Sequence, residues 1–359
     1  MEAVAEASLN DDITSVVERA IRDRVFPGAV VGVALHGGDM FSAHGTHTYA
    51  ANATAVTSRT MFDVASLTKV FATVTAVMQL VEQGTLRLDE PACRLLPELA
   101  GDAKRGITLA HLLTHMAGFP QFIPNHRSYK TPAALLDAIA SVELVYRPGH
   151  GRIYDDIAYI LLGLLLERAT GMRLDDYCRD HIFRPLDMID TMFLPPPPLH
   201  DRIAPTEDDA ERGLLWGVVH DDNAFTLGGV AGHAGLFSTA HDLIGFCKML
   251  LRHRNAEVLS GESIRRLRER LWRDEDGEYG LGWDRLRPSY MGAIDDRDAI
   301  GHTGFTGTSI VVSARRDLAI VLLTNRVHPA RSDRAAIDEV RRELATTIIR
   351  RLDRRSTLP

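Results

Sequence analysis

The segment 308-TSIVVSARRDLAIVLLTN-325 contains two apolar runs separated by a short polar turn at 314–317. Runs rich in valine, isoleucine and leucine, joined by so few polar residues, are typical of a β-hairpin. A second hairpin is predicted toward the other end, where 28-GAVVGVALHGG-38 closes on two glycines and is followed by a shorter strand candidate at 39–45. The sequence therefore predicts an antiparallel pair of strands near each end.

A helical pattern lies beside each hairpin, at 11–24 and at 331–351. Two hairpins with flanking helices are most simply joined in one antiparallel sheet that the terminal helices cover. On this basis residues 1–65 and 295–359 form an α/β sheet region, and residues 66–294 form a mostly helical inserted region. We therefore expect an α/β (α+β) fold.

The inserted region is expected to be helical because its apolar residues recur at intervals of three and four. The first helix begins at the serine of 66-SLTKVFATVTAVMQLVEQG-84 and ends at the glycine. A polyproline II segment is predicted at 194–199, and a solvated helix face leading into a loop at 265–278. Further helices are expected near 108–116, 132–141, 155–170, 173–182 and 239–251.

Composition excludes several classes of function. The 359 residues are 25% charged, with a net charge of −7 and alternating signs, so nucleic acid is not an expected partner. No apolar run is long enough to span a membrane, so we expect no membrane partner. The acidic start of the chain lacks the basic and apolar segments of a secretory signal, which predicts a cytoplasmic location. The oligomeric state stays open.

Metal-binding patterns are weak. Cys93, Cys178 and Cys247 are far apart and form no C-x-x-C pair, which indicates buried thiols. His111 and His115 have the i, i+4 spacing of zinc ligands but no glutamate between them, so we interpret them as polar residues at a helix end. These patterns therefore predict no metal site.

Ser66 and Lys69 are the strongest candidates for chemistry. The chain carries 37 arginines but only four lysines, so Lys69 is an unusual choice of cation. A desolvated lysine can give up or pass on a proton, whereas arginine stays protonated. Residues i and i+3 share a helix face, and the N–H of Ser66 at the helix start is available to a developing oxyanion. The alternative is that Ser66 only caps the helix and Lys69 faces solvent.

Two further segments favour the catalytic interpretation. Tyr154 and Asp156 follow a glycine-rich turn in 147-RPGHGRIYDDIAYILLGLLLE-167, and His302, Thr303 and Gly304 begin 301-GHTGFTGTS-309. Ser66-x-x-Lys69, Tyr154-x-Asp156 and His302-Thr303-Gly304, in this order, resemble the three active-site elements of the serine β-lactamase and penicillin-binding-protein superfamily. The similarity is greatest to the class C branch, which includes esterases, D-aminopeptidases and acyltransferases. It covers about residues 10–350.

The resemblance implies a β-lactamase/transpeptidase-like fold and an acyl-enzyme mechanism, which needs no metal and no organic cofactor. The sheet region and the helical region would form one catalytic domain with the active site between them. Ser66 would be the nucleophile, Lys69 and Tyr154 would share the work of the general base, and the N–H groups of Ser66 and Phe305 would form the oxyanion hole. Asp156, His302, Thr303 and Gly304 would bind the substrate.

Two positions depart from the pattern of the resemblance. Asp156 stands where class C enzymes usually have asparagine; it would keep Lys69 charged, favour Tyr154 as the base and accept a cationic or amine-bearing substrate. His302 replaces the usual lysine and is a poorer permanent anchor for a substrate carboxylate, which makes a cell-wall peptide less expected. His233, in a glycine-rich segment, is a further possible substrate contact.

Three functions are compatible with these residues. The first is a hydrolase that cleaves an ester or amide of a small molecule. The second is an acyltransferase that passes the acyl group from Ser66 to an amine or alcohol acceptor. The third is a penicillin-binding sensor that is acylated and not turned over. Motifs in one chain do not separate them, because the difference lies in access of water and of an acceptor to the acyl-enzyme.

Overall fold

An eight-stranded antiparallel sheet forms the centre of the computed structural model, which describes residues 2–36, 38–124, 126–252, 257–331 and 333–356. The strand order is β2-β1-β13-β12-β11-β10-β9-β8. The strands of this sheet are β1 (Gly28–Leu35), β2 (Gly38–Gly45), β8 (Trp272–Arg273), β9 (Glu278–Tyr279), β10 (Asp284–Arg285), β11 (Ile300–Thr303), β12 (Ser309–Ser313) and β13 (Leu318–Thr324).

Short strands outside this sheet and a set of helices make up the remaining regular structure. The short strands are β3 (Phe62–Asp63), β4 (Met192–Phe193), β5 (Asp208–Asp209), β6 (Gly213–Leu214) and β7 (Leu236–Ser238). The α-helices are α1 (Glu2–Arg22), α2 (Thr75–Glu82), α3 (Leu109–Leu113), α4 (Pro132–Ser141), α5 (Ile157–Thr170), α6 (Leu174–Cys178), α7 (Asp222–Thr226), α8 (Ala240–Arg252), α9 (Gly261–Leu267), α10 (Pro288–Met291) and α11 (Arg334–Ser356).

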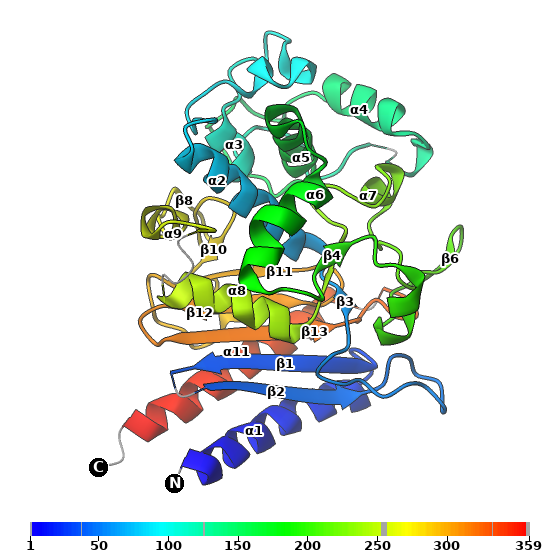
Figure 1. Ribbon diagram of the computed structural model, residues 1–359, viewed down its shortest axis with the longest axis vertical. Coiled ribbons are helices and arrows are strands. Elements are labelled where there is room, and N and C mark those ends of the chain that lie inside the picture. Colours follow the sequence, from blue (N-terminus) through cyan, green and yellow to red (C-terminus); the bar gives the residue numbers. More distant parts are fainter. Residues whose placement is uncertain (1, 37, 125, 253–256, 332, 357–359) are drawn as a thin grey trace.

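The two predicted hairpins meet in the sheet. β1 and β13 pair antiparallel from Ala29 opposite Thr324 to Ala34 opposite Ala319. The alternating apolar residues of these strands divide between two cores, one on each face of the sheet. α1 and α11 cover one face, as expected (Figure 1). The predicted antiparallel sheet with terminal helices is confirmed.

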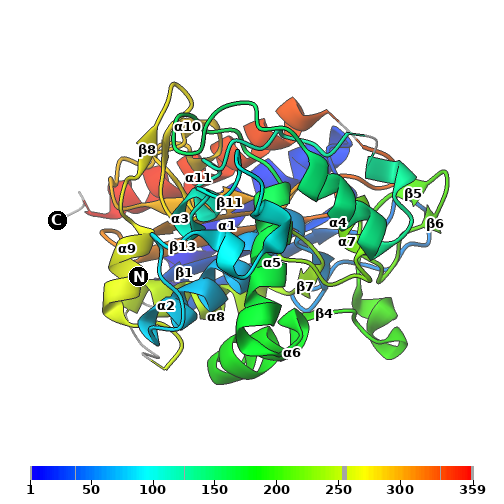
Figure 2. The ribbon, with the colours of Figure 1, turned by 90° about the horizontal axis from the view of Figure 1, so that it is seen from above.

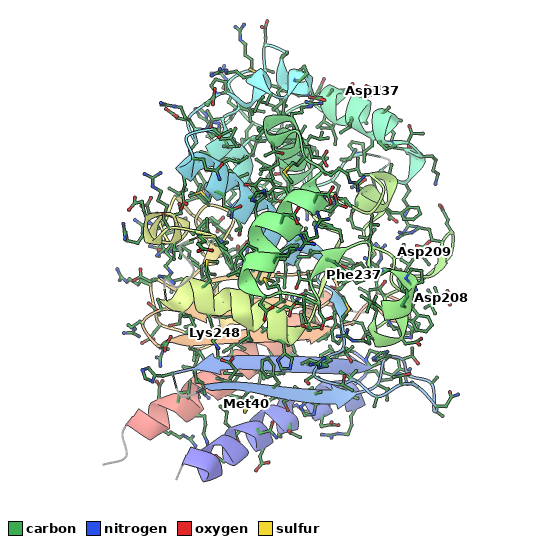
Figure 3. The ribbon with its side chains drawn as sticks, in the orientation of Figure 1. Met40, Asp137, Asp208, Asp209, Phe237 and Lys248 are labelled. Atoms are coloured by element: carbon green, nitrogen blue, oxygen red, sulfur yellow. The ribbon has the colours of Figure 1, made fainter. Side chains whose placement is uncertain are left out.

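The opposite face of the sheet carries α8 and the helical region. Gly32 of β1 allows this close approach, because a Cβ atom there would lie 2.9 Å from Ile244 of α8. Lys248 of α8 pairs with Asp39 of β2 at 2.8 Å, while Met40 packs into the core on the other face (Figure 3). Seen from above, the helical region lies over the strands, with α1 and α11 behind them (Figure 2).

The helix predicted from residue 66 is divided into three conformations. A 3₁₀ turn (Ala65–Leu67) is followed by a π-helical segment (Lys69–Val74) and then by α2. The Thr75 hydroxyl donates to the Val70 carbonyl, five residues back, at 2.9 Å, which fits the wider π turn. The apolar residues at 67, 70, 71, 74, 77 and 78 are fully buried, as their spacing predicts.

Other expectations need correction. The polyproline stretch ends early, because a 3₁₀ helix runs from Pro197 to Arg202. The helix predicted at 11–24 begins earlier, at Glu2. Strands β8, β9 and β10 extend the sheet with residues from the region expected to be mostly helical. Two-residue strands have no detectable period, and this explains why the sequence pattern does not predict them. None of the described helices is long and apolar enough to cross a membrane.

Candidate active site

Ser66 lies on a strained turn between β3 and the π-helical segment. Ala65, just before it, has a φ of 48°, in the left-handed region that residues with a Cβ rarely adopt. The buried carboxylate of Asp63 holds this turn by accepting hydrogen bonds from the N–H of Ala65 and the N–H of His220, both at 2.8 Å. The serine is therefore presented on a backbone that its surroundings fix in place.

Lys69 is completely buried and directs its ammonium group at three acceptors. It donates to Ser66 Oγ at 3.0 Å, to Asp156 Oδ1 at 2.7 Å and to the carbonyl of His233 at 3.3 Å. Burial lowers the pKa of Lys69, but Asp156 and Tyr154 raise it more, and the net shift is upward. Lys69 is therefore charged at neutral pH and is not a solvent-facing residue.

Tyr154 lies against both Lys69 and Ser66. Interactions with both residues lower the pKa of its phenol, and Lys69 Nζ lies 5.0 Å from the centroid of its ring. Burial raises the pKa of Tyr154, Lys69 lowers it and Asp156 raises it, with a net upward shift. Lys69 therefore makes this phenol more acidic than burial alone would leave it, but the pKa of Tyr154 stays above its ordinary value.

A buried pair, Asp155 and His115, supports the Tyr154 ring from behind. The ring of His115 lies 4.6 Å from that of Tyr154, between centroids, and its Nδ1 accepts the N–H of Asp155 at 3.2 Å. Asp155 Oδ2 lies 3.2 Å from the same Nδ1, and burial raises the pKa of this carboxyl to about 8. Burial also holds the pKa of His115 well below its usual value. A protonated Asp155 can thus donate to a neutral His115.

The third motif lies at the end of β11, against the turn that carries Ser66. Thr308 Oγ1 donates to the carbonyl of Val64 at 3.1 Å, and a Cβ atom at Gly304 would lie 2.5 Å from that carbonyl oxygen. Arg341 of α11 donates to the carbonyl of Gly304 at 2.8 Å. Because the peptide group is planar and trans, the N–H of Phe305 points away from Arg341. No described residue accepts a hydrogen bond from this N–H.

The remaining predicted contacts have distinct environments. His302 is buried at the pocket wall, with Nδ1 2.9 Å from the carbonyl of Thr303, and burial lowers its pKa to about 4. It is therefore neutral at pH 7. The side chain of His233 is buried and its Nε2 lies 2.7 Å from Asp221 Oδ1. Burial raises the pKa of Asp221, whereas His233, Ala224 and Lys69 lower it, with a net downward shift.

These residues surround a pocket of about 440 Å³. Ser66, Tyr154, Asp156, His302, Thr303, Gly304 and Phe305 all contribute to its wall, whereas the catalytic candidate Lys69 and the possible contact His233 lie just behind it. The pocket wall carries charges of both signs, from the carboxylates of Asp156, Asp221, Asp222 and Asp284 and from the guanidinium groups of Arg287, Arg326, Arg331, Arg334 and Arg341.

One group of side chains has the spacing of metal ligands. Oxygens of Asp156 and Asp221 and a ring nitrogen of His233 lie within 4.8 Å of one another. The ammonium group of Lys69 already donates to Asp156, and a bound metal ion would stand against this positive charge. The cluster therefore suits the lysine better than a metal ion. His111 instead completes a capping box with Thr108 at the start of α3.

Comparison with known protein families shows to which family the chain belongs. The beta-lactamase family matches residues 13–345, which include Ser66, Tyr154 and His302. The chain belongs to this family. Curated relatives of this beta-lactamase-family chain include a "putative D-alanyl-D-alanine carboxypeptidase" from Salmonella typhi, 32% identical over 311 residues that cover 76% of this chain and 71% of the relative. The corresponding protein of Salmonella paratyphi A has the same identity and coverage.

Solved structures agree on the fold of this beta-lactamase-family chain. A class C beta-lactamase superposes with a TM-score of 0.78 at 18% identity and covers 95% of this chain and 98% of its own. The octameric penicillin-binding protein homologue from Pyrococcus abyssi superposes with a TM-score of 0.73 at 24% identity, covering 87% and 72%. The expected β-lactamase/transpeptidase-like fold is confirmed.

Several residues of the site were missed by sequence reasoning. The arginines come from the end of β13 and the start of α11, and Asp221 from the loop before α7, so only the fold brings them to Ser66. The sequence did contain a signal for the Asp155–His115 pair, because Asp155, a second acidic residue, lies directly between Tyr154 and Asp156. Nothing in the sequence marks Arg341 among 37 arginines.

Proposed function

We propose that this chain is a serine hydrolase that cleaves an amide or ester through an acyl-enzyme on Ser66. The observation that carries this proposal is one shared nitrogen: Lys69 Nζ hydrogen-bonds with Ser66 Oγ at 3.0 Å and with Asp156 at 2.7 Å, from a fully buried position. A merely structural lysine needs a partner for its charge, but it does not need the hydroxyl of a serine on a strained turn at the wall of a pocket.

In the proposed reaction, Ser66 Oγ attacks the substrate carbonyl carbon and loses its proton to Tyr154. Lys69 and Ser66 both lower the pKa of Tyr154, which favours the phenolate that accepts the proton. The tetrahedral oxyanion is held by the N–H groups of Ser66 and Phe305. Tyr154 then gives the proton to the leaving group and becomes a phenolate again. This phenolate takes a proton from the water that attacks the acyl carbonyl, and Tyr154 passes it to Ser66 Oγ as the acyl group leaves.

Three arginines in the pocket wall support a leaving group that carries a carboxylate. His302 is neutral at pH 7 and cannot hold such a charge, whereas Arg326, Arg331 and Arg334 line the same pocket. Arg326 is buried, donates to the carbonyl of Phe305 at 2.8 Å and lies over the Phe305 ring. Arginines suit this task, because their charge does not change over the working pH range. A D-alanyl-D-alanine end, as in the names of the relatives, has such a carboxylate.

The test measures hydrolysis of a panel of p-nitrophenyl esters together with intact-protein mass. Wild type is compared with Ser66→Ala and with Ser289→Ala, a control at an exposed serine of α10. We expect turnover and a transient acyl adduct in wild type and in the control, and neither in Ser66→Ala. Adduct without turnover would indicate a sensor, and amide product forming ahead of acid with an added amine would indicate a transferase.

The carboxylate preference is tested with matched peptides. N-acetyl-D-alanyl-D-alanine and its C-terminal amide differ only in the charge of the leaving group. We expect kcat/KM to be higher for the free acid by roughly 10-fold or more, because each charge-assisted hydrogen bond contributes about 1.5–3 kcal/mol. Equal values of kcat/KM for the two peptides would be compatible with a hydrolase but would show that the arginines do not recognise the substrate carboxylate.

A further inference from the structure

The ring of Phe305 is held by its neighbours although much of it is exposed. Phe305 lies in the pocket wall, and 45% of its surface is exposed. The ring of His220 stacks on it, with 5.5 Å between the ring centroids and 23° between the planes. The guanidinium carbons of Arg326 and Arg331 lie 4.9 Å and 5.5 Å from the centroid of the Phe305 ring. Three planar groups therefore contact a phenyl ring that still offers apolar surface to a ligand.

Glu207 fixes two of these three groups. Its Oε2 lies 2.8 Å from Nε2 of His220 and 2.9 Å from Nε of Arg331. The hydrogen bond with His220 lowers the pKa of Glu207, burial raises it and Arg331 lowers it, and the resulting pKa is about 2. Glu207 is therefore ionised at neutral pH and binds both groups as an anion. Because its neighbours are anchored in this way, the Phe305 ring loses little conformational freedom when a ligand packs on it.

Exposure alone does not mark a binding surface, since single exposed apolar residues are common on proteins. Phe225 of α7 is an example. Its surface is 48% exposed and the guanidinium carbon of Arg212 lies 4.9 Å from its ring centroid, but Phe225 is not part of the pocket wall. Phe305 differs because its ring lies in the pocket and its own backbone N–H is the proposed oxyanion donor. A substrate carbonyl bound to this N–H lies within the length of one residue of the ring.

The arginines indicate which part of the substrate contacts the ring. Arg326 donates from Nε to the carbonyl of Phe305 at 2.8 Å, which fixes the guanidinium group relative to Phe305. In the proposed function, Arg326 and Arg331 receive the carboxylate of the leaving group, while the Phe305 N–H receives the oxyanion. The residue between the cleaved bond and this carboxylate is the leaving residue. Its side chain is therefore the group that the Phe305 ring can contact.

An aromatic side chain suits this position. Two phenyl rings attract each other in offset-stacked or edge-to-face arrangements, and guanidinium groups also stack on aromatic faces. An alanine methyl group would cover much less of the exposed ring and would bury correspondingly less apolar surface. The pocket volume of about 440 Å³ is within the range of about 300–1,000 Å³ that small-molecule sites have.

We propose that Phe305 determines specificity by binding an aromatic or large apolar side chain of the leaving residue. This inference rests on the proposed acyl-enzyme function and names its substrate class, which is a short peptide whose C-terminal residue is larger and more apolar than alanine. The name of the Salmonella typhi relative, D-alanyl-D-alanine carboxypeptidase, has alanine at this position. The preferred leaving residue of this chain is therefore different.

The experiment measures binding without turnover in Ser66→Ala protein. Calorimetric titration compares N-acetyl-D-alanyl-D-phenylalanine with its sequence isomer N-acetyl-D-phenylalanyl-D-alanine and with N-acetyl-D-alanyl-D-alanine. The two isomers have the same atoms and charge, and differ only in whether the ring belongs to the leaving residue or to the acyl part. We expect the first peptide to bind roughly 10- to 100-fold more tightly than the other two, the range expected from burying a phenylalanine side chain. Equal binding of the isomers, or tighter binding of the second, would overturn the proposal.

Variants in the same background assign the preference to a residue. Phe305→Ala should reduce the ratio of the affinities for the two isomers to less than about one third of its starting value, and Phe305→Leu should reduce it less. Phe225→Ala is the matched control and should retain the ratio. Thermal melts confirm that each variant is folded. If the ratio falls in Phe122→Ala, at another exposed phenylalanine of the pocket wall, but not in Phe305→Ala, the assignment to Phe305 is wrong.

Failure of this inference can be distinguished from failure of the proposed function. If wild type shows no adduct and no turnover with p-nitrophenyl esters while Ser66→Ala still prefers the first isomer, the hydrolase is wrong and Phe305 belongs to a binding site. If the esters are turned over but Ser66→Ala binds the two isomers equally, the hydrolase is retained and the role of Phe305 in specificity is wrong.

Discussion

Arg341 holds the carbonyl of Gly304. Its Nη2 donates to that oxygen and to the carbonyl of Thr308, both at 2.8 Å, while Nη1 pairs with Asp338 at 2.7 Å. The guanidinium thereby fixes the orientation of the peptide whose other end is the N–H of Phe305. We regard Arg341 as a positioning residue for the oxyanion hole.

Replacing Arg341 by leucine should lower kcat by roughly 10- to 100-fold and change KM much less. Without Arg341 the Phe305 N–H would no longer be held in place, and its hydrogen bond is needed only when the oxyanion forms in the transition state. Steady-state kinetics on a neutral ester measure both constants. Arg341→Lys should recover part of the loss, and Arg342→Leu, at an exposed neighbour that pairs with Glu339, is the matched control. An increase in KM alone would assign Arg341 to substrate binding.

Tyr154→Phe should lower kcat/KM by roughly 10²–10⁴, the usual contribution of a general acid–base group. The substitution removes only the hydroxyl, so the ring keeps its place against His115. Stopped-flow acylation with a p-nitrophenyl ester measures the step directly. Tyr177→Phe, at a buried tyrosine of α6 outside the pocket, is the control. A decrease in kcat/KM of less than tenfold would indicate that Lys69, and not Tyr154, is the base.

The pH dependence should follow Asp156. Its charge raises the pKa of Lys69 and also that of Tyr154, so either group loses its proton more easily once the charge is removed. In wild type, kcat/KM should therefore still rise with pH above 7. In Asp156→Asn the rise should move to lower pH by about one pH unit or more. Rate profiles from pH 6 to 9 test this, with Asp175→Asn on α6 as the control; an unmoved profile would contradict it.

Asp155 and His115 predict how stability changes with pH. The pKa of Asp155 is raised to about 8 in the folded chain, so between its unfolded value and pH 8 the folded state binds more protons, and stability falls as pH rises. The pKa of His115 is lowered, so its contribution is lost as pH falls below its usual value. Below about pH 6.5 the two residues change the free energy of unfolding in opposite directions, and between about pH 6.5 and 8 only Asp155 changes it.

Asp155→Asn should remove this decline, because an amide can donate to His115 and accept from Ala158 as the protonated acid does. Urea unfolding of wild type and variant at pH 6.5 and pH 8 measures the difference in the free energy of unfolding. The variant should gain stability relative to wild type at the higher pH. A constant difference between the two proteins would show that Asp155 is ionised throughout this range.

The sheet and the catalytic motifs could be predicted because each lies in a continuous stretch of sequence. The hairpins at 28–45 and 308–325 are strongly apolar, and their pairing as β1 with β13 follows from simple layer packing. Ser66 and Lys69 are three residues apart, so local geometry alone brings them together. The conformation around them is not a regular α-helix. Asp63 accepts a hydrogen bond from the N–H of Ala65 just before Ser66, and Thr73 donates to the carbonyl of Gly232, far away in the sequence.

The charge pattern of the pocket could not be predicted, because it depends on side chains from distant segments. Asp221 precedes α7, Arg326 follows β13, and neither stands in a motif. The sequence did indicate that His302 is a weak anchor, and the buried ring agrees. The expectation that a cell-wall peptide is a less favoured substrate rests on His302 alone, whereas the fold also brings arginines to the pocket.

The packing of α11 on α1 links the chemistry to local unfolding. The two helices share a core on the face of the sheet away from the pocket, and Arg19 of α1 pairs with Glu343 of α11 (Figure 1). α11 also carries Arg341, so any opening of this outer layer would release the Phe305 N–H while the turn at Ser66 stays folded. Loss of the proposed oxyanion donor would thus precede global denaturation, and the temperature at which activity is lost should lie below the Tm.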